Sequence, residues 1–463
     1  MKKLRVILAL VFWTGITLLF LGIPEIASWF GWMPKLQFLP AVMALNFTTV
    51  AVVILACLLI GRIYCSAICP LGVMQDGISH ASVIAKRVRK NRKPFHYRKE
   101  LKWLRYGIWV IFVLAVAFGF QSFVAVLAPY SAYGRILQSI VHFQPGIVLA
   151  VAAATLMLTV LLAWFTGREY CNVICPVGTT LSFFSRFAVF RPVIDVDKCK
   201  NCKVCENNCK AGCIDIANHR IDYSRCVDCF NCIGNCKFDA LHYRNYYKKD
   251  SSKQEPSTAN QGRRAFITGT AMGLTAMTLG AQNKKKDGGY ALVEDKQALE
   301  RETPLTPPGS VSIKDFYRRC TACQLCVAAC PNGVLRPSTG LEHFMQPEMG
   351  FEKGYCRPEC TKCSEVCPSG AIIKITREEK TQYHVGTASV NRDLCVAEQG
   401  TKCGNCARHC PTGAIQMVES PEGNLVPAVD AAICIGCGAC ENLCPSRPVS
   451  AITVNGRHNH LNN

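Results

Sequence analysis

The sequence predicts an α-helical membrane domain joined to small α+β domains that bind metal clusters. Two observations lead to this prediction. The first 190 residues contain four long stretches without a charged side chain, and the remainder contains most of the 30 cysteines, closely spaced in runs. A hydrophobic fraction of 50% with only 18% charged residues excludes a purely soluble or disordered chain. Tight cysteine runs suit metal binding better than cross-links between distant segments.

The four uncharged stretches cover residues 6–21, 41–60, 106–127 and 146–165. Each approaches the roughly 20 residues that a helix needs to cross a bilayer. A signal peptide would account for the first stretch and would leave the other three unexplained. We therefore expect four transmembrane helices, in a domain that spans residues 1–190.

The basic residues predict the orientation of these helices. The net charge is +20, and eleven Lys and Arg residues fall in 61–105, whereas 22–40 and 129–145 contain one each. Basic loops remain in the cytoplasm, so the N-terminus, the 61–105 loop and the chain after 166 are expected there. The excess charge then reflects topology and contact with anionic lipid, and no nucleic-acid partner is expected.

An internal repeat follows each pair of predicted helices. Segment 62–72 reads RIYCSAICPLG and segment 168–178 reads REYCNVICPVG. Both copies end an even-numbered helix, so Cys65, Cys69, Cys171 and Cys175 are expected at one level of the membrane. Four such thiolates could hold an iron–sulfur cluster or another metal, or could cycle as redox dithiols.

Several other cofactors are not expected. The predicted helices contain no His pair for haem, and the chain has no C-x-x-C-H motif for covalent haem attachment. No G-x-G-x-x-G opens a helix after a strand, so neither a nicotinamide nor a flavin site of that type is predicted.

Residues 191–247 form a second predicted domain, with two C-x2-C-x2-C-x3-C motifs. This is the spacing of bacterial ferredoxins, in which the fourth cysteine of one motif ligates the cluster of the other. The expected ligand sets for two [4Fe–4S] clusters are Cys199, Cys202, Cys205 with Cys236, and Cys226, Cys229, Cys232 with Cys209. Cys213 and Cys57 have no assigned role.

A third predicted domain, residues 291–463, contains four more motifs, two of them with a longer first gap. Their sixteen cysteines imply four further cubanes, which makes six in total. The ligands are Cys320, Cys323, Cys326, Cys330, Cys356, Cys360, Cys363, Cys367, Cys395, Cys403, Cys406, Cys410, Cys434, Cys437, Cys440 and Cys444.

The linker 248–290 connects these two domains. Arg263 and Arg264 precede a weakly apolar stretch that ends at Ala281. A twin-arginine pair before such a stretch is typical of the Tat export route, which carries folded proteins out of the cytoplasm. The last domain is therefore expected in the periplasm, with 265–281 either cleaved or retained as a fifth span.

These motifs resemble two protein families. The four spans, the C-x3-C-P repeats and the two-cluster domain are similar to NapH/MauN-type membrane components of quinol dehydrogenases. The twin-arginine segment and the four-cluster domain, with the run GTKCGNC at 400–406, resemble NapG/MauM-type periplasmic ferredoxins. Those two components are normally separate chains, whereas here they are fused.

The resemblance implies oxidation of membrane quinol and delivery of electrons to a periplasmic reductase of the nitrate reductase type, or to a cytochrome c. It also implies a protein of the bacterial inner membrane. In such four-cluster domains the first motif pairs with the last and the second with the third. Cys444 would then complete the Cys320 cluster, Cys330 the Cys434 cluster, Cys410 the Cys356 cluster and Cys367 the Cys395 cluster.

Two positions for a quinol site remain open from the residues. His142 and Glu25 lie near the predicted outer face, where an imidazole can accept a proton. A cytoplasmic site near Tyr64, Asp76, Glu169 and Tyr170 is the other. Two alternative functions also remain: donation of electrons for maturation or reactivation of a metalloenzyme, and electron entry from a cytoplasmic ferredoxin or reductase.

Overall fold

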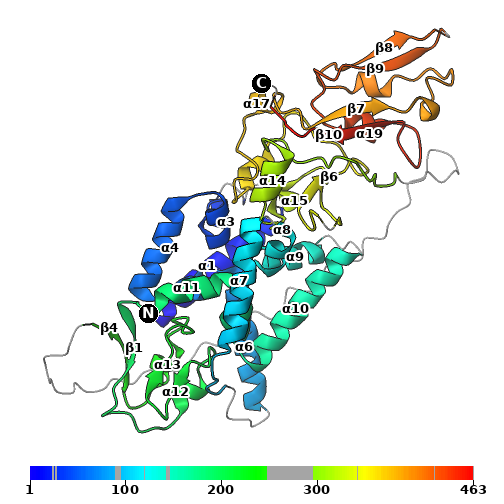
Figure 1. The fold of residues 1–463 in the computed structure, drawn as a ribbon. Helices are drawn as coiled ribbons and strands as arrows, with labels where there is room; N and C mark the ends of the chain where they lie inside the picture. Colours follow the sequence, from blue (N-terminus) through cyan, green and yellow to red (C-terminus); the bar gives the residue numbers. More distant parts are fainter. Residues whose placement is uncertain are drawn as a thin grey trace.

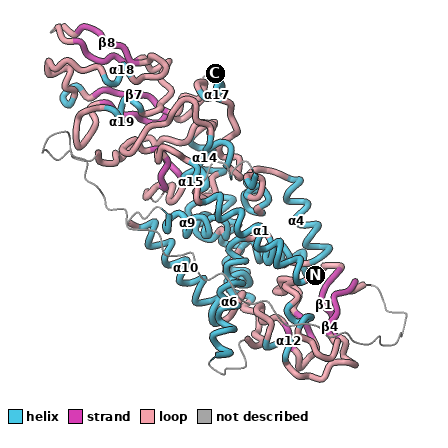
Figure 2. Tube along the Cα trace, turned by 180° about the vertical axis from the view of Figure 1, so that it is seen from behind, coloured by secondary structure: helices cyan, strands magenta, loops and turns pink. Residues whose placement is uncertain are grey.

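The computed structural model describes residues 1–22, 26, 29–88, 95–118, 120–141, 146–247, 296–340, 342–421 and 423–461. A bundle of helices occupies the middle of the molecule, and a loop-rich module with short strands lies at each of its two ends (Figures 1 and 2). The module of residues 190–247 lies at one end, and the C-terminal domain from residue 296 lies at the other (Figure 1).

The bundle is formed by the chain up to residue 185. Its helices are α1 (Lys2–Phe20), α3 (Phe38–Met43), α4 (Phe47–Ile60), α5 (Ile63–Ala67), α6 (Pro70–Val88), α7 (Lys102–Phe118), α8 (Gln121–Leu127), α9 (Pro129–Val141), α10 (Ile147–Phe165) and α11 (Pro176–Ser185). A short 3-10 turn at Pro34–Leu36 and a π turn at Tyr170–Ile174 complete it.

Two of the four expected spans form single long helices, and the other two are broken. In the described residues, α1 and α10 have the length and apolarity to cross a membrane. The stretch 41–60 is divided between α3 and α4, because Leu45 adopts a left-handed conformation and Asn46 caps α4 by accepting from Thr49 N at 3.2 Å. The stretch 106–127 is divided between α7 and α8. The expectation of four uninterrupted spans is therefore corrected.

The module of residues 190–247 is closed by one antiparallel strand pair. Its elements are β1 (Phe190–Ile194), α12 (Val204–Asn207), β2 (Ile214–Asp215), β3 (Arg220–Ile221), α13 (Asn231–Gly234) and β4 (Leu241–Asn245). Strand β1 pairs with β4, with Phe190 opposite Asn245, and β2 pairs with β3. The two cysteine motifs lie between the paired ends, so the sheet holds both cysteine loops together.

The C-terminal domain repeats this scheme with longer loops. Its elements are α14 (Ile313–Arg319), α15 (Leu325–Ala329), β5 (Leu335–Pro337), β6 (Pro347–Met349), α16 (Lys362–Val366), α17 (Arg377–Lys380), β7 (Gly386–Val390), a 3-10 turn (Arg392–Leu394), α18 (Asn405–Arg408), β8 (Ile415–Glu419), β9 (Leu425–Val429), α19 (Ala439–Leu443) and β10 (Ile452–Gly456). The antiparallel pairs are β5 with β6, β8 with β9, and β7 with β10.

The bundle and the C-terminal domain share one hydrophobic core. Buried side chains from α1, α9 and α15, such as Phe20, Tyr130 and Leu325, belong to the same cluster. The contact is close, since a methyl group added at Gly134 of α9 would lie 2.3 Å from the carbonyl oxygen of Cys323. Ser131, one turn earlier, donates to the carbonyl of Thr321. The first cysteine loop of this domain therefore sits directly on α9.

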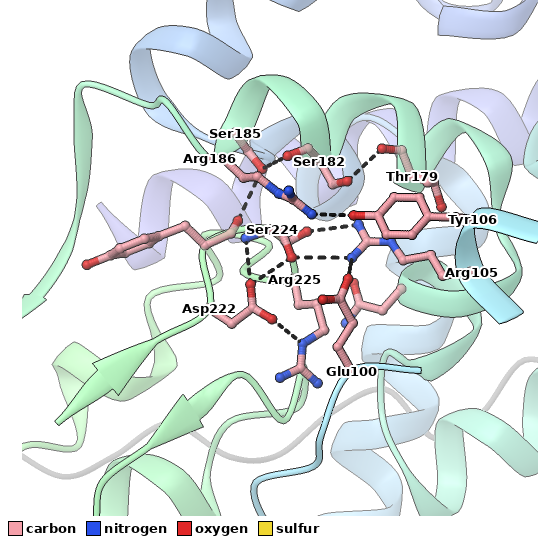
Figure 3. A network of polar contacts seen from close by, with 12 residues as sticks. Glu100, Arg105, Tyr106, Thr179, Ser182, Ser185, Arg186, Asp222, Ser224 and Arg225 are labelled. Carbon is pink, nitrogen blue, oxygen red and sulfur yellow. Dashed lines mark hydrogen bonds and ion pairs between the residues drawn. The ribbon is translucent and has the colours of Figure 1, made fainter. Parts of the chain in front are cut away.

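Polar contacts join the module of residues 190–247 to the opposite end of the bundle. Arg105 of α7 pairs with Glu100 at 2.6 Å and donates to Ser224 Oγ at 3.3 Å, and Ser224 Oγ donates to Asp222 at 2.7 Å (Figure 3). Ser185 Oγ of α11 donates to the carbonyl of Tyr223 at 3.1 Å. These bonds hold the loop immediately before Cys226 against the helices.

Candidate metal centres

Two cavities in the module of residues 190–247 are each surrounded by four motif cysteines. One is lined by Cys199, Cys202, Cys205 and Cys236. The other is lined by Cys226, Cys229, Cys232 and Cys209, with Cys213 beside them. In both, the fourth cysteine comes from the other motif, which is the arrangement that the ferredoxin spacing predicts.

The backbone curls around the second cysteine of each regularly spaced motif. Residues on both sides of that cysteine are left-handed: Asn201 and Lys203 flank Cys202, and Asp228 and Phe230 flank Cys229. The C-terminal domain has the same feature at Ala322 and Gln324, and at Gly436 and Gly438. This conformation is strained for residues other than Gly, and strained backbone conformations are concentrated at functional sites. It wraps the loop so that three thiols face one space.

The C-terminal domain contains the same kind of cavity but pairs its motifs differently from the expectation. One cavity is lined by Cys356, Cys360, Cys363 and Cys330, and another by Cys434, Cys437, Cys440 and Cys410. Motif one therefore pairs with motif two, and motif three with motif four. The expected pairing of first with last and second with third was wrong.

The two remaining sets follow the same rule. Cys320, Cys323 and Cys326 each interact electrostatically with Cys367 of the second motif. The chain just after Cys444 contacts the start of the third motif, because Ser446 Oγ donates at 3.0 Å to the carbonyl of Leu394, the residue before Cys395. The corrected pairing has a physical reason: motifs that are adjacent in the sequence fold together as one local unit. The longer first gaps of the second and third motifs form loops that leave these adjacent motifs in contact.

The geometry of these cavities suits a cubane rather than a single ion. Within the described residues, no three Cys, His, Asp or Glu side chains converge on a point where one metal ion could sit. Each thiolate of a [4Fe–4S] cluster binds a different iron, so the four sulfurs need only surround a common space. Four-cysteine cavities meet that requirement.

The C-x3-C-P repeats bring four more thiols together inside the bundle. We call Cys65, Cys69, Cys171 and Cys175 the repeat quartet; all four are buried. The electrostatic neighbours of Cys175 include the other three thiols. The repeats thus bring their cysteines together, as the duplication predicts.

The arginines of the two repeats interlock. Arg62 donates to the carbonyl of Cys171 at 3.3 Å, and Arg168 donates to the carbonyl of Cys65 at 2.9 Å. Each also approaches the sulfur of its own repeat, Arg62 at 3.8 Å from Cys65 Sγ and Arg168 at 3.6 Å from Cys171 Sγ. Both guanidinium groups have no solvent exposure. Our sequence reasoning assigned these arginines no role, although their presence in both copies was a signal.

The last glycine of the repeat motif is required by this interlock. A methyl group at Gly72 would lie 2.2 Å from the carbonyl oxygen of Cys65 and 2.8 Å from Arg168 Nη1. At Gly178 it would lie 2.2 Å from the carbonyl oxygen of Cys171 and 2.8 Å from Arg62 Nη2. Any side chain there would push the two repeats apart.

A groove of about 810 Å³ lies between α1 and α6, next to the module of residues 190–247. Its walls are mainly apolar, and its polar lining includes Arg5, Asp76, His80 and Lys210. Asp76 accepts from Arg5 at 2.9 Å, Arg168 at 2.6 Å and Lys210 at 2.5 Å. Burial alone would raise the pKa of Asp76, but Arg168 and Lys210 hold it well below its usual range.

Several residues of the sequence predictions lie outside the described residues. These are His142 and Glu25 of the outer quinol site, and the linker 248–290 with its twin arginines. Of the alternative cytoplasmic site, Asp76 lines the groove, whereas Tyr64 and Tyr170 are buried in the bundle and Glu169 pairs with Arg98 at 3.7 Å.

Two family models match the chain. A model described as a 4Fe–4S dicluster domain matches residues 319–397 and 401–447. A model described as a 4Fe–4S binding domain matches residues 42–93 and 148–194, which contain the two C-x3-C-P repeats. Both matches indicate multiple 4Fe–4S clusters. No solved structure matches the chain.

Three curated proteins are similar to about a third of the chain. The ferredoxin-type protein NapF of Escherichia coli strain K12 is 32% identical over 157 residues, which cover 34% of this chain and 87% of NapF. The methylamine utilization ferredoxin-type protein MauM of Methylobacillus flagellatus is 31% identical, over 34% of this chain and 70% of MauM. The ferredoxin-type protein NapG of Escherichia coli strain K12 is 30% identical, over 34% of this chain and 75% of NapG.

Proposed function

Because this chain belongs to the ferredoxin-type 4Fe–4S proteins of the NapF, NapG and MauM kind, we propose that it oxidises quinol in the bacterial inner membrane and delivers the electrons to a periplasmic reductase. The six ferredoxin motifs would hold six [4Fe–4S] clusters. The bundle would act as a NapH-type membrane component and the C-terminal domain as a NapG-type electron carrier.

The surface of the bundle supports a membrane location. Large apolar side chains are exposed on α1, α4, α7 and α10, including Phe47 at 77% and Trp103 at 95% of their full exposure. Apolar faces of this extent on a folded protein indicate contact with lipid or with a partner. The two metal-binding modules lie at opposite ends of the bundle, as expected if one faces the cytoplasm and the other the periplasm (Figure 1).

The groove between α1 and α6 is the quinol site that the geometry supports best. Its apolar walls suit a quinone ring and tail, and its convergent polar groups can orient the ring oxygens. Lys210, which lines the groove, directly follows Cys209, a lining residue of the second cavity. A quinol in this groove would therefore lie next to the first acceptor cluster. This adjacency is the observation that carries the proposal.

The polar residues of the groove can perform distinct tasks. Arg5 and Lys210 present cations to the ring oxygens, and Asp76 holds both cations in place. Asp76 is a weak base, since its pKa lies well below the usual range. His80 is exposed and lines the groove, so its imidazole is placed to accept a proton from the ring. A [4Fe–4S] cluster bound beside the groove would accept one electron at a time, so the two electrons of a quinol would leave singly.

The test is anaerobic reduction of the purified, oxidised chain by a reduced quinol, followed by iron–sulfur bleaching and by EPR. We expect quinol to reduce a substantial fraction of the clusters that dithionite reduces. Gly77→Phe should block the groove, because a side chain at Gly77 meets open space there. Gly107→Phe is the matched control, since it also enters open space but lies on α7.

Quinol-dependent reduction that survives in Gly77→Phe would move the quinol site elsewhere. If dithionite reduces the clusters and quinol reduces none, quinol oxidation is wrong. Cys202 is exposed, so a soluble cytoplasmic donor can approach the cavity that Cys202 lines with Cys199, Cys205 and Cys236. This observation favours electron entry from such a donor as the second candidate function.

A further inference from the structure

The repeat quartet consists of two cysteine pairs, neither of which can hold a cubane alone. Each segment matched by the 4Fe–4S binding domain model contains one C-x3-C pair: Cys65 and Cys69 in the first, Cys171 and Cys175 in the second. A [4Fe–4S] cluster needs four protein ligands in its usual form. Any cubane at this position must therefore bridge the two repeats.

Of the two arginines at the quartet, Arg168 forms an ion pair with Asp76 at 2.6 Å, whereas Arg62 forms none among the described residues. The guanidinium group of Arg62 has no carboxylate oxygen within 4 Å there, and the carboxylate of Asp228 interacts with it only at longer range. Its polar partners are Asn172 Oδ1, two backbone carbonyls and Cys65 Sγ. Its Nε has no hydrogen-bond partner there. Leaving a guanidinium buried without a counter-charge is costly. A cubane bound by four thiolates is anionic and would supply that charge.

Two helix N-termini add to this field. Cys69 and Cys175 each directly precede a helix that begins with Pro, α6 at Pro70 and α11 at Pro176. Gly178 N, in the first turn of α11, donates to Cys175 Sγ at 3.4 Å. A helix N-terminus stabilises negative charge and lowers the cost of a thiolate. Both repeats thus direct a helix dipole and an arginine at the same four sulfurs.

The quartet lies between the two metal-binding modules. On one side, Arg62 Nη1 donates at 2.9 Å to the carbonyl of Ser224, two residues before Cys226. On the other side, Tyr64, next to Cys65, interacts electrostatically with Tyr130, and Tyr130 interacts in the same way with Cys323. The first repeat therefore contacts the loop before Cys226, and Tyr64, Tyr130 and Cys323 belong to one buried cluster on the other side.

We propose that Cys65, Cys69, Cys171 and Cys175 jointly bind a further [4Fe–4S] cluster, which passes single electrons between the two modules. Its core is reduced by one electron as the neighbouring cluster is oxidised by one, and no bond or proton is exchanged. The ligand assignment is independent of the donor. The direction of flow, from quinol through the Cys226 cluster to the Cys320 cluster, rests on the proposed function.

The first test is the iron and sulfide content of the anaerobically purified full chain. With six ferredoxin clusters, the quartet cluster raises the iron content from about 24 to about 28 atoms per chain. Cys65→Ser and Cys175→Ser should each lose about four iron atoms together with one cubane component in the Mössbauer spectrum. Cys57→Ser is the control, since Cys57 is a buried thiol of α4 outside the repeats.

Retention of the other clusters in Cys65→Ser shows that the variant folds. If both variants lose all iron, the iron content of the unaltered chain decides the question, because about 24 atoms per chain overturns the proposal. A two-iron spectrum, or a quartet recovered as disulfides without iron, overturns it as well.

The relay is tested by quinol reduction of the same variants. We expect quinol to reduce the clusters of residues 191–247 in Cys65→Ser but to reduce those of the C-terminal domain at least tenfold more slowly than in the unaltered chain. Equal rates in both domains would overturn the relay while leaving quinol oxidation standing. Absence of quinol reduction in the unaltered chain would overturn the proposed function and leave the iron content to decide the ligand assignment.

Discussion

Arg62 Nη1 and the carbonyl oxygen of Ser224 form a hydrogen bond of 2.9 Å between the first cysteine repeat and the loop that leads to Cys226. Arg105 Nη2 donates to the same oxygen at 3.2 Å. Both arginines are fully buried. A single backbone carbonyl therefore receives two buried cations, and it joins the helical bundle to the module of residues 190–247.

Replacement of Arg62 should loosen this junction. In Arg62→Gln, Asn172 Oδ1 and the carbonyl of Cys171 lose this donor, and each unsatisfied buried group costs about 1–3 kcal/mol. The carbonyl of Ser224 keeps only the hydrogen bond from Arg105. We expect a lower unfolding temperature and faster hydrogen–deuterium exchange in 222–229. Arg220→Gln, at an exposed position of β3, should leave both measurements unchanged. Unaltered exchange in Arg62→Gln would mean that Arg105 alone secures the loop.

The corrected motif pairing makes a prediction about double variants. Cys330 and Cys356 line one cavity, whereas Cys330 and Cys434 line two different ones. We therefore expect Cys330→Ser with Cys356→Ser to lose about four iron atoms, and Cys330→Ser with Cys434→Ser to lose about eight. Iron analysis of the purified variants measures this difference. The reverse result would restore the pairing of first motif with last.

Lys380 should raise the reduction potential of one cluster in the C-terminal domain. Its buried ammonium group donates to Cys356 Sγ at 3.3 Å and to the carbonyl of Cys360 at 2.6 Å. A cation beside the sulfurs favours the reduced, more negative cluster. Lys380→Met should lower one potential by on the order of 100 mV, given about 4 kcal/mol for a nearby charge. Redox titration by EPR measures it.

Lys374→Met is the matched control for that titration, since Lys374 is exposed and only six residues away. Equal potentials in the two variants would show that the ammonium group of Lys380 serves packing alone.

His460 should make the C-terminal domain less stable in mild acid. Burial lowers the pKa of His460, although its hydrogen bond with the carbonyl of Ser310, at 2.7 Å, acts in the opposite direction. A depressed pKa means that stability is fully present above the ordinary pKa of about 6.5 and is lost as pH falls through the folded value. Stability should then fall by up to about 1.4 kcal/mol per pH unit.

The measurement is the unfolding temperature of the domain between pH 8 and pH 5.5, followed by the cluster absorbance. His460→Gln should flatten the decrease below about pH 6.5, because no proton is then taken up at this position. His458→Gln, at an exposed position two residues away, should keep the full decrease. A decrease of equal slope in both variants would assign the acid sensitivity to other groups.

The sequence alone determined the local chemistry of this protein. The 2-2-3 cysteine spacing specifies a loop that wraps around a cluster, because three ligands within seven residues leave the backbone few conformations. The left-handed residues on both sides of Cys202 and Cys229 are the result. The duplicated R-x-Y-C-x-x-x-C-P-x-G motif likewise indicated that four cysteines meet, because similar motifs at equivalent helix ends bring equivalent side chains to the same level.

Only the tertiary structure decided how these pieces combine. Which motif supplies the fourth thiol, as Cys330 does for the second motif, depends on how neighbouring loops pack, and spacing within a motif carries no such information. Composition cannot show that Leu45 and Asn46 break an apolar stretch into two helices, because Asn46 acts as a cap only in that local backbone. The hydrogen bonds of Arg62 and Arg168 to the opposite repeat are long-range, because each guanidinium group donates to a carbonyl more than a hundred residues away in the sequence.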